Sequence, residues 1–235
     1  MPQKVNNTMI DRHLSAVIPA AGIGKRVGAN IPKQYLPLLD KTIIEHSLMP
    51  FLEHPAITRV IVSLAENDQW FNKLPVATHP KIETVVGGDE RVDSVLAALN
   101  IINESDYVLV HDAARPCIKL SDINKLINEV KINQQGAILA RKVCDTMKRS
   151  DSDNNIVTTV DRTCLWHALT PQMFINKQLI NAINESAHSE KITDEASALE
   201  MSGLPVSIVE GRSDNLKVTR EEDLKLAAFY LAQGE

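Results

Sequence analysis

Short apolar runs alternate with segments of helical periodicity along most of the chain. The runs are rich in β-branched residues and nearly continuous in apolar character, which is typical of strands buried on both faces of a parallel sheet. They cover residues 14–20, 58–65, 81–86, 106–112 and 136–143. Between them, residues 43–53, 91–103 and 121–133 place apolar side chains at helical spacing. Strand followed by helix, repeated, predicts an α/β fold with a mostly parallel sheet and right-handed crossovers.

Two helix starts have a recognisable capping pattern. Thr42 precedes the first helical segment with Glu45 three residues later, and Thr219 and Glu222 repeat that spacing before the last one. Both pairs predict a capping box, in which the two residues satisfy each other's backbone N–H groups. Pro50 lies inside the first segment, and it predicts a kink or an early end of that helix.

The alternation breaks between about residues 142 and 172. A polar turn, "SDSDNN", is flanked there by segments containing Thr and Val, which predicts a β-hairpin or arm that projects from the main sheet. Helical signals return at 176–186 and 193–203, and a strand follows at 205–211. We therefore expect a flexible N-terminal head over residues 1–13 and a single domain over residues 14–235 that carries the arm.

Composition and charge exclude several classes of protein. No apolar stretch reaches the roughly 18 to 20 residues of a transmembrane helix, and the polar first residues lack the core of a signal peptide. The three cysteines form no CxxC pair, so neither a zinc ribbon nor a disulfide framework is indicated, and a cytoplasmic location is expected. A formal net charge of −5 argues against nucleic-acid binding. Any anionic ligand must therefore be held by a local basic cluster.

A glycine-containing loop, "PAAGIGKRVG", follows the first predicted strand. Such loops present backbone N–H groups to phosphates. A P-loop is excluded, because Pro19 stands where its first glycine belongs and Arg26 where its hydroxyl residue belongs. A dinucleotide fingerprint is disfavoured, because Gly22 and Gly24 fit its spacing but Val27 occupies the third glycine position.

Positive charge in this loop favours a third interpretation. Lys25, Arg26 and Lys33 lie within nine residues of one another in an acidic protein. A basic surface loop would explain any one of them. Together with the strand and the glycines, they predict a clamp for a triphosphate.

Five motifs in order along the chain extend this prediction. They are "PAAGIGKR" (19–26), "VVGGDERVDSVLAAL" (85–99), "VLVHDAARP" (108–116), "TDEASALE" (193–200) and "DNLKVTREEDL" (214–224). As an ordered set they resemble the signature of the 2-C-methyl-D-erythritol 4-phosphate cytidylyltransferases, from about Ala16 to Tyr230. The resemblance implies a Rossmann-like nucleotidyltransferase sheet and a reaction of CTP with methylerythritol phosphate.

The resemblance also implies a CTP site. In that family the first motif wraps the base and triphosphate, so Arg26 and Lys33 are expected to stabilise charge on the reacting phosphates. Fixed cations at such positions lower the barrier to nucleotidyl transfer. The implied CTP contacts are Ala20, Ala21, Gly22, Gly24, Gly88, Asp89 and Ser94.

The acceptor side is implied in the same way. Arg162 and Lys217 match residues that hold the attacking phosphate, so the implied catalytic set is Arg26, Lys33, Arg162 and Lys217. Asp112 is the expected protein ligand of a Mg²⁺ ion held mainly by the CTP phosphates. Further expected substrate contacts are Asp112, Ala113, Arg115, Thr146, Thr170 and Thr193.

Some of these residues have simpler explanations. His111 is expected to serve packing or hydrogen bonding. From the sequence pattern alone, Thr193 is the N-cap of its helix and Lys217 an exposed lysine at a strand end. Thr146 and Arg162 lie in the arm, which in the family interlocks two subunits of a homodimer. Whether they act in their own site or in the partner's stays open.

The implied reaction gives 4-diphosphocytidyl-2-C-methyl-D-erythritol and pyrophosphate, in isoprenoid precursor biosynthesis. The acceptor phosphate is already anionic, so positioning and charge neutralisation suffice and no nucleophilic triad is needed. Two alternatives stay open. One is a cytidylyltransferase for another sugar-alcohol phosphate such as ribitol 5-phosphate, and the other is a non-catalytic nucleotide-binding module.

Overall fold

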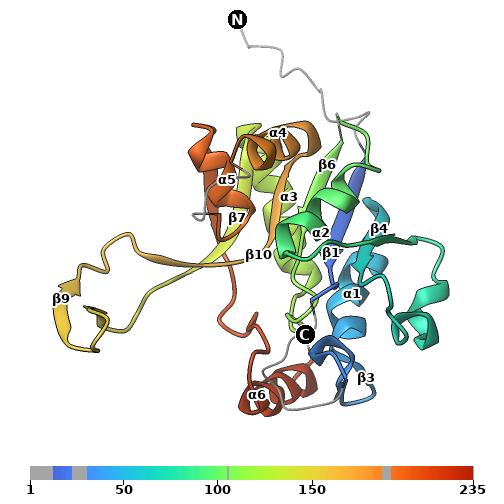
Figure 1. The fold of residues 1–235 in the computed structure, drawn as a ribbon, viewed down its shortest axis with the longest axis horizontal. Coiled ribbons are helices and arrows are strands. Elements are labelled where there is room, and N and C mark those ends of the chain that lie inside the picture. The colour runs from blue at the N-terminus through green and yellow to red at the C-terminus, as the bar shows by residue number, and fades with distance from the viewer. Residues whose placement is uncertain (1–12, 23–30, 105, 187–191, 235) are drawn as a thin grey trace, which may run out of the picture.

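The computed structural model describes residues 13–22, 31–104, 106–186 and 192–234, so most of the expected N-terminal head lies outside the described residues (Figure 1). A seven-stranded sheet runs through the structure in the order β11-β7-β10-β6-β1-β4-β5. Its strands are β1 (Leu14–Pro19), β4 (Ile57–Leu64), β5 (Ile82–Val86), β6 (Tyr107–Val110), β7 (Gly136–Lys142), β10 (Trp166–Ile175) and β11 (Val206–Glu210). Every neighbouring pair is parallel except the two that β10 makes with β6 and β7. The expected mostly parallel α/β fold is confirmed.

Helices cover both faces of this sheet. They are α1 (Ile43–Glu53), α2 (Arg91–Leu99), α3 (Leu120–Asn133), α4 (Asn176–Ser186), α5 (Glu195–Met201) and α6 (Glu221–Ala232). Along β1, Ala16 and Ile18 belong to the core shared with α1 and α3, whereas Val17 belongs to the core shared with α2, α4 and α5. Because successive side chains of a strand point to opposite faces, a strand covered on both sides must be apolar throughout. None of the described helices combines the length and apolar character needed to cross a bilayer.

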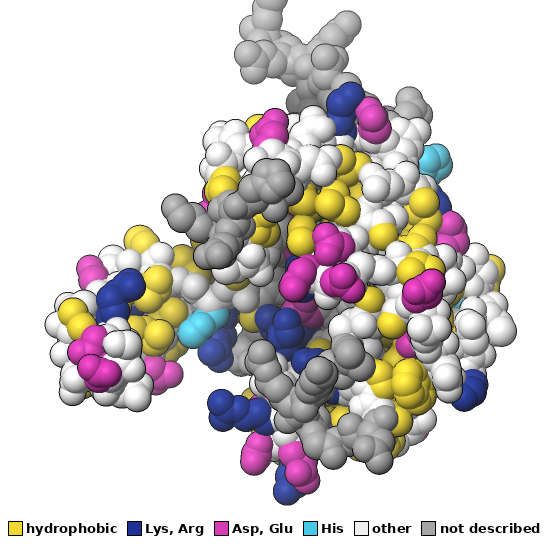
Figure 2. Space-filling view, viewed as in Figure 1, with side chains coloured by type: hydrophobic (Ala, Val, Ile, Leu, Met, Phe, Trp, Pro, Cys, Tyr) yellow, Lys and Arg dark blue, Asp and Glu magenta, His cyan; other side chains and the backbone are white. Residues whose placement is uncertain are grey.

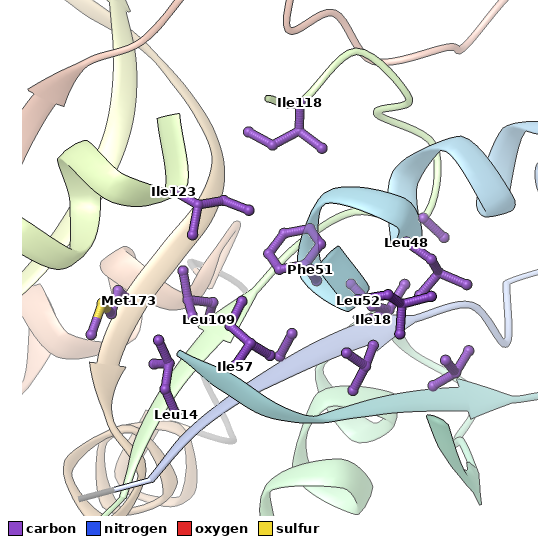
Figure 3. Close-up of a cluster of buried hydrophobic side chains, with 14 of the residues drawn as sticks. Leu14, Ile18, Leu48, Phe51, Leu52, Ile57, Leu109, Ile118, Ile123 and Met173 are labelled. Carbon is purple, nitrogen blue, oxygen red and sulfur yellow. The ribbon is translucent and has the colours of Figure 1, made fainter. Parts of the chain in front are cut away.

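Figure 3 shows the core on the α1 and α3 face of the sheet. Leu48 and Phe51 from α1 and Ile123 from α3 meet Ile18 of β1 and Leu109 of β6, and all five side chains are fully buried. Full burial of one such side chain stabilises the fold by about 1.5 to 3 kcal/mol. This packing fixes β1 and β6, whose carboxyl ends lead directly to several of the expected site residues, among them Ala20, Gly22 and Asp112.

The start of α1 is as expected, but Pro50 does not end the helix early. Glu45 N donates to Thr42 Oγ1 at 3.4 Å and Thr42 N donates to Glu45 Oε2 at 2.9 Å, which confirms the capping box. Of the two outcomes expected at Pro50, a kink or an early end, the early end is wrong, since α1 continues to Glu53. A proline this close to the end removes a single intrahelical bond, and the burial of Phe51 just after it favours continuation.

Two other helix ends also differ from expectation. Glu222 does not cap the last helix, because Asp223 Oδ2 accepts from Thr219 N at 2.8 Å and Arg220 N at 2.9 Å. Adjacent acidic residues compete for this role, and α6 starts one residue later than the sequence pattern suggested. The helix expected to reach residue 103 ends at Leu99, where turn-type backbone bonds replace the helical ladder.

The expected hairpin projects from the body as an arm (Figure 1). Its strands β8 (Met147–Ser150) and β9 (Ile156–Val160) pair antiparallel. The sequence did not reveal β10, whose first residues lie within the range assigned to the arm, and whose Gln172–Ile175 portion pairs with β6 in the central sheet. Pro171 hides this strand because proline cannot donate to a ladder, and the pairing with β7 is irregular between Ala168 and Gln172.

Two very short strands and three 3₁₀ turns complete the described part of the fold. The strands β2 (Pro37–Leu38) and β3 (Lys41–Thr42) form a small ladder beside α6. The 3₁₀ turns are η2 (Lys33–Tyr35), η3 (Phe71–Lys73) and η4 (Pro75–Thr78). Of these, η2 is the one that reaches the carboxyl edge of the sheet.

His111 lies just beyond β6 and is fully buried. Its Nδ1 is 2.9 Å from Thr170 Oγ1, its Nε2 is 3.1 Å from Arg115 O, and its ring centroid lies 5.0 Å from that of Phe51. Burial lowers the pKa of His111 to about 4, although the charge of Asp112 acts in the opposite direction. The expected packing and hydrogen-bonding role of His111 is confirmed.

This burial makes stability depend on pH. An unfolded chain protonates His111 near its ordinary pKa of 6.5, whereas the folded chain resists protonation down to about 4. We therefore expect the free energy of unfolding of the ligand-free protein to fall as pH drops through this window, by about 1.4 kcal/mol per pH unit from this group. The measurement is urea unfolding at several pH values, in which His111→Gln has a shallower dependence than the wild type.

His167→Gln is the matched control, because His167 is exposed on β10. It should retain the pH dependence of the wild type. Equal dependence in the wild type and His111→Gln would contradict the assignment of this effect to His111.

Candidate functional site

A hollow of about 210 Å³ opens where β1, β5 and β6 end. Its walls come from the loop after β1, from η2, from the loop that leads into α2, from the segment after β6 and from Lys217. In open α/β sheets, ligands bind outside the carboxyl ends of the strands. Figure 2 shows Lys and Arg side chains gathered where the arm leaves the body.

Close packing of two loops shapes one side of this hollow. A Cβ atom on Gly87 would lie 2.6 Å from Ser94 Oγ and 2.7 Å from Ala21 Cβ, so only glycine fits there. Gln34 is buried and holds the loop after β1, because its Nε2 donates to Ala20 O at 2.8 Å and Gly22 O at 3.2 Å. The site thus presents backbone groups in a fixed arrangement.

Asp112 stands at the centre of a charged cluster directly after β6. Its Oδ1 accepts from Arg91 Nε at 3.2 Å, and its Oδ2 accepts from Arg115 Nε at 3.2 Å and from Lys217 Nζ at 2.9 Å. The Asp112 side chain is only 9% exposed. Three cations from three separate segments therefore converge on one carboxylate.

Burial and charge act against each other in this cluster. Burial opposes ionisation of Asp112, but the charges of Arg91, Lys217 and Arg115 outweigh it and hold its pKa well below the ordinary value. Burial disfavours the charge on Arg91, yet Glu195 and Asp112 raise its pKa. The pKa of Arg115 is lowered, mainly by burial. Asp112 and Arg91 consequently stay charged at neutral pH, and a second anion entering the site meets the same cations.

A second hollow, of about 250 Å³, adjoins the first. Arg91, Asp112 and Lys217 line both, so they form the wall between them. The second hollow is also lined by Arg115, Ala168, Thr170, Gln172, Thr193 and Asp194. Two substrates bound side by side would therefore meet across the charged wall.

Thr170 is tied into the wall rather than left free. Its Oγ1 accepts from Asp112 N at 3.1 Å, and its backbone oxygen accepts from Asn215 Nδ2 at 2.8 Å. Asn215 O in turn accepts from Arg115 Nη1 at 2.9 Å. Thr170 thereby links β10 to the segment that carries Lys217.

Most of the residues singled out from sequence lie together. The first hollow contains Ala20, Ala21, Gly22, Lys33, Gly88, Asp89, Ser94, Asp112, Ala113 and Lys217. The second contains Arg115, Thr170 and Thr193. Lys33 Nζ also donates to Val218 O at 3.0 Å, which joins η2 to the Lys217 segment. Gly24 and Arg26 lie outside the described residues.

The arm residues do not join this group within one chain. Thr146 and Arg162 are exposed and line neither hollow. Arg162 Nη1 donates to Cys144 O at the base of the arm. Within one subunit, the described site therefore lacks both expected arm contacts.

The simpler explanations of Thr193 and Lys217 are not supported. Asp194, not Thr193, is the N-cap of α5, because its Oδ1 accepts from Ser197 N at 3.0 Å. Thr193 lies one residue earlier and lines the second hollow. Lys217 is exposed, as that explanation expects, but it lies beyond the end of β11 at Glu210 and its Nζ pairs with buried Asp112.

Sequence reasoning missed two charged residues of the site. Arg91 Nη1 donates to Glu195 Oε1 at 2.6 Å and Nη2 donates to Oε2 at 3.1 Å. Both residues stand within the quoted motifs "GGDERVDSV" and "TDEASALE". The motifs therefore pointed to both residues, but no local sequence pattern shows that their side chains pair.

Without substrate phosphates, the cluster around Asp112 offers few ligands to a metal ion. Among the described residues, no group of three or more His, Cys, Asp or Glu side chains could hold one. Asp112 is one suitable carboxylate, and both of its oxygens accept bonds from cations. Mg²⁺ commonly takes one or two carboxylates with substrate phosphates and water, so this donor set fits an ion that arrives with a triphosphate.

Comparison with known proteins places the chain in a family. A family model described as 2-C-methyl-D-erythritol 4-phosphate cytidylyltransferase matches residues 14–233. Proteins of that name from Tolumonas auensis and Aeromonas hydrophila are each 56% identical to the chain over 94% of its length, covering 97% and 90% of their own.

Solved structures agree with this placement. The crystal structure of the Francisella tularensis 2-C-methyl-D-erythritol 4-phosphate cytidylyltransferase is 36% identical, with a TM-score of 0.81 over 93% of this chain and 99% of that one. The Thermus thermophilus structure of the same name is 25% identical, with a TM-score of 0.76 over 92% of this chain and 98% of that one. The mostly parallel sheet, the two adjoining hollows and these likenesses agree, and the chain belongs to the 2-C-methyl-D-erythritol 4-phosphate cytidylyltransferase family of nucleotidyltransferase enzymes.

Proposed function

We propose that the chain transfers the cytidylyl group of CTP to 2-C-methyl-D-erythritol 4-phosphate, giving 4-diphosphocytidyl-2-C-methyl-D-erythritol and pyrophosphate. The observation that supports this best is the pair of hollows divided by Arg91, Asp112 and Lys217. A transfer between two phosphate-bearing substrates needs two neighbouring sites with cations at their boundary. CTP is assigned to the first hollow and the acceptor to the second.

In this mechanism an acceptor phosphate oxygen attacks the α-phosphorus in line, and pyrophosphate leaves on the opposite side. Lys217 and Arg115 attract the acceptor phosphate from one side of Asp112, while Lys33 and Arg26 stabilise charge on the triphosphate. A cation stabilises the transition state most when the protein already holds it in place before the reaction. Lys217 meets this condition through Asp112, and Lys33 through its bond to Val218 O.

Mg²⁺ is the proposed cofactor, held mainly by the CTP phosphates with Asp112 as its protein ligand. When bound, the ion would neutralise charge on the triphosphate.

The three free thiols, Cys117, Cys144 and Cys164, support the expected cytoplasmic location, where thiols stay reduced.

We infer a homodimer in which the arm meets the partner subunit. Ile156 and Val157 on β9 are 67% and 63% exposed, so the arm carries apolar side chains that a partner subunit can cover. The arm also carries Thr146 and Arg162 away from the hollows of their own chain. In a two-fold dimer each arm can complete the site of the other subunit.

The activity is tested by pyrophosphate release from CTP or UTP with methylerythritol phosphate and Mg²⁺. We expect turnover that prefers CTP and stops with EDTA. Ribitol 5-phosphate is the control acceptor and should react poorly. Preference for UTP, or no turnover with any of these pairs, would overturn the proposal.

Lys33→Ala tests the triphosphate contact. Loss of one preorganised cation should lower kcat by about two orders of magnitude or more. Lys177→Ala is the control, because Lys177 pairs with Glu104 on the exposed surface and lines neither hollow. An unchanged kcat in folded Lys33→Ala protein would remove Lys33 from the mechanism.

Subunit mixing tests the role of the arm. Lys33→Ala and Arg162→Ala proteins, each nearly inactive, are unfolded and refolded together. Random pairing makes half of the dimers mixed. If Arg162 acts in the partner's site, each mixed dimer has one intact site out of two, so about one quarter of wild-type activity returns. Activity that stays at the level of the separate variants would mean that Arg162 acts in its own subunit.

A further inference from the structure

Glu195 and Arg91 form a two-point ion pair that joins the walls of the two hollows. The Nη1–Oε1 and Nη2–Oε2 distances are 2.6 and 3.1 Å, which is the fork geometry that arginine makes with a carboxylate. The Glu195 side chain is only 3% exposed, whereas that of Arg91 is 34% exposed and faces both hollows. Arg91 begins α2, next to the nucleotide loop, and Glu195 begins α5, two residues after Thr193.

This pairing decides how Arg91 meets Asp112. The fork is occupied by Glu195, so only Nε is left for Asp112 Oδ1, at 3.2 Å. The other oxygen, Oδ2, is thereby kept for Lys217 and Arg115. If Glu195 lost its charge, the Arg91 fork would be free to take both oxygens of Asp112 and compete with Lys217.

Glu195 is held in place without help from Arg91. Gln172 on β10 is buried; its Nε2 donates to Asp194 Oδ2 at 2.8 Å and its Oε1 accepts from Ala196 N at 3.0 Å. These bonds fasten the residues on both sides of Glu195 to the central sheet. Glu195 is therefore the fixed member of the pair, and the longer, more exposed Arg91 side chain is the one that it orients.

We propose that Glu195 is a positioning residue for the cytidylyl transfer described above, on which this inference rests. It binds the Arg91 fork, limits Arg91 to a single contact with Asp112 and so leaves Lys217 correctly placed for the acceptor phosphate. The pair also fixes α5 against α2, which sets the relation between the acceptor hollow and the nucleotide loop. Glu195 itself does not touch the reacting atoms.

Glu195→Gln is the decisive variant, because glutamine keeps the size and one hydrogen-bond acceptor but removes the charge. We expect kcat/KM for methylerythritol phosphate to fall about ten- to a hundredfold, through both a higher acceptor KM and a lower kcat. Affinity for CTP without acceptor, measured by calorimetry, should change by less than about threefold, because Gly88 and Ser94 keep their contacts. A purely structural role would lower the melting temperature and leave the acceptor KM of the folded protein unchanged.

A double-variant comparison shows whether Glu195 acts through Arg91. If it does, the double variant that combines Arg91→Gln and Glu195→Gln should have a kcat/KM for the acceptor within about twofold of that of the single variant Arg91→Gln. Additive losses would overturn the proposed route. Arg91→Lys leaves Glu195 intact and tests the second part of the proposal: lysine keeps the charge but cannot bind Glu195 at two points, so α5 is held less firmly against α2 and the acceptor KM should again rise.

Glu83→Gln is the matched control. Glu83 makes a similar two-point pair with Arg59, with both distances 2.6 Å, and neither residue lines a hollow. Its kinetic constants should equal those of the wild type. If the wild type turns over and folded Glu195→Gln has the same kcat and acceptor KM, the positioning role is overturned. If the wild type does not turn over, the proposed activity itself is overturned.

Discussion

The antiparallel pairing of β10 with both β6 and β7 is the constraint on which the site and the arm depend. A Cβ on Gly136 of β7 would lie 2.4 Å from Phe174 Cδ1, so the ring of Phe174 on β10 lies against position 136 only because that residue is glycine. From this one strand, Thr170 reaches the backbone of Asp112 and Gln172 holds the start of α5. Farther out, the same strand forms one side of the arm's base.

Buried charge is tolerated at the described site because each charge there has an opposite partner. Asp112 faces three cations, and Arg91 faces both Asp112 and Glu195. Such an arrangement need not stabilise the fold, since removing ions from water is costly, and an apolar cluster could serve stability as well. Its benefit is a set of fixed charges at the boundary of two hollows, where the proposed transfer between two phosphates needs them.

The sequence predicted the strands well because burial on both faces leaves a nearly continuous apolar run. It also predicted which residues gather at the hollows, partly because ligands meet the carboxyl ends of strands and partly through likeness to a family. It did not predict β10, because Pro171 breaks the strand pattern, nor the cap of α6, because Glu222 and Asp223 both suit that role. The pair of Arg91 and Glu195 joins residues 104 positions apart, and contacts at such separation leave no local pattern.

The bond from Lys33 Nζ to Val218 O joins residues 185 positions apart, so the first hollow has walls from opposite ends of the described chain. During synthesis the chain emerges from the N-terminus, and contacts of this length form last. The strands and loops around Ala20 and Gly88 can fold earlier, but the cation at position 217 reaches Asp112 only after nearly all of the chain has left the ribosome. A nascent chain can therefore assemble much of the proposed nucleotide-binding surface well before it can become a working enzyme.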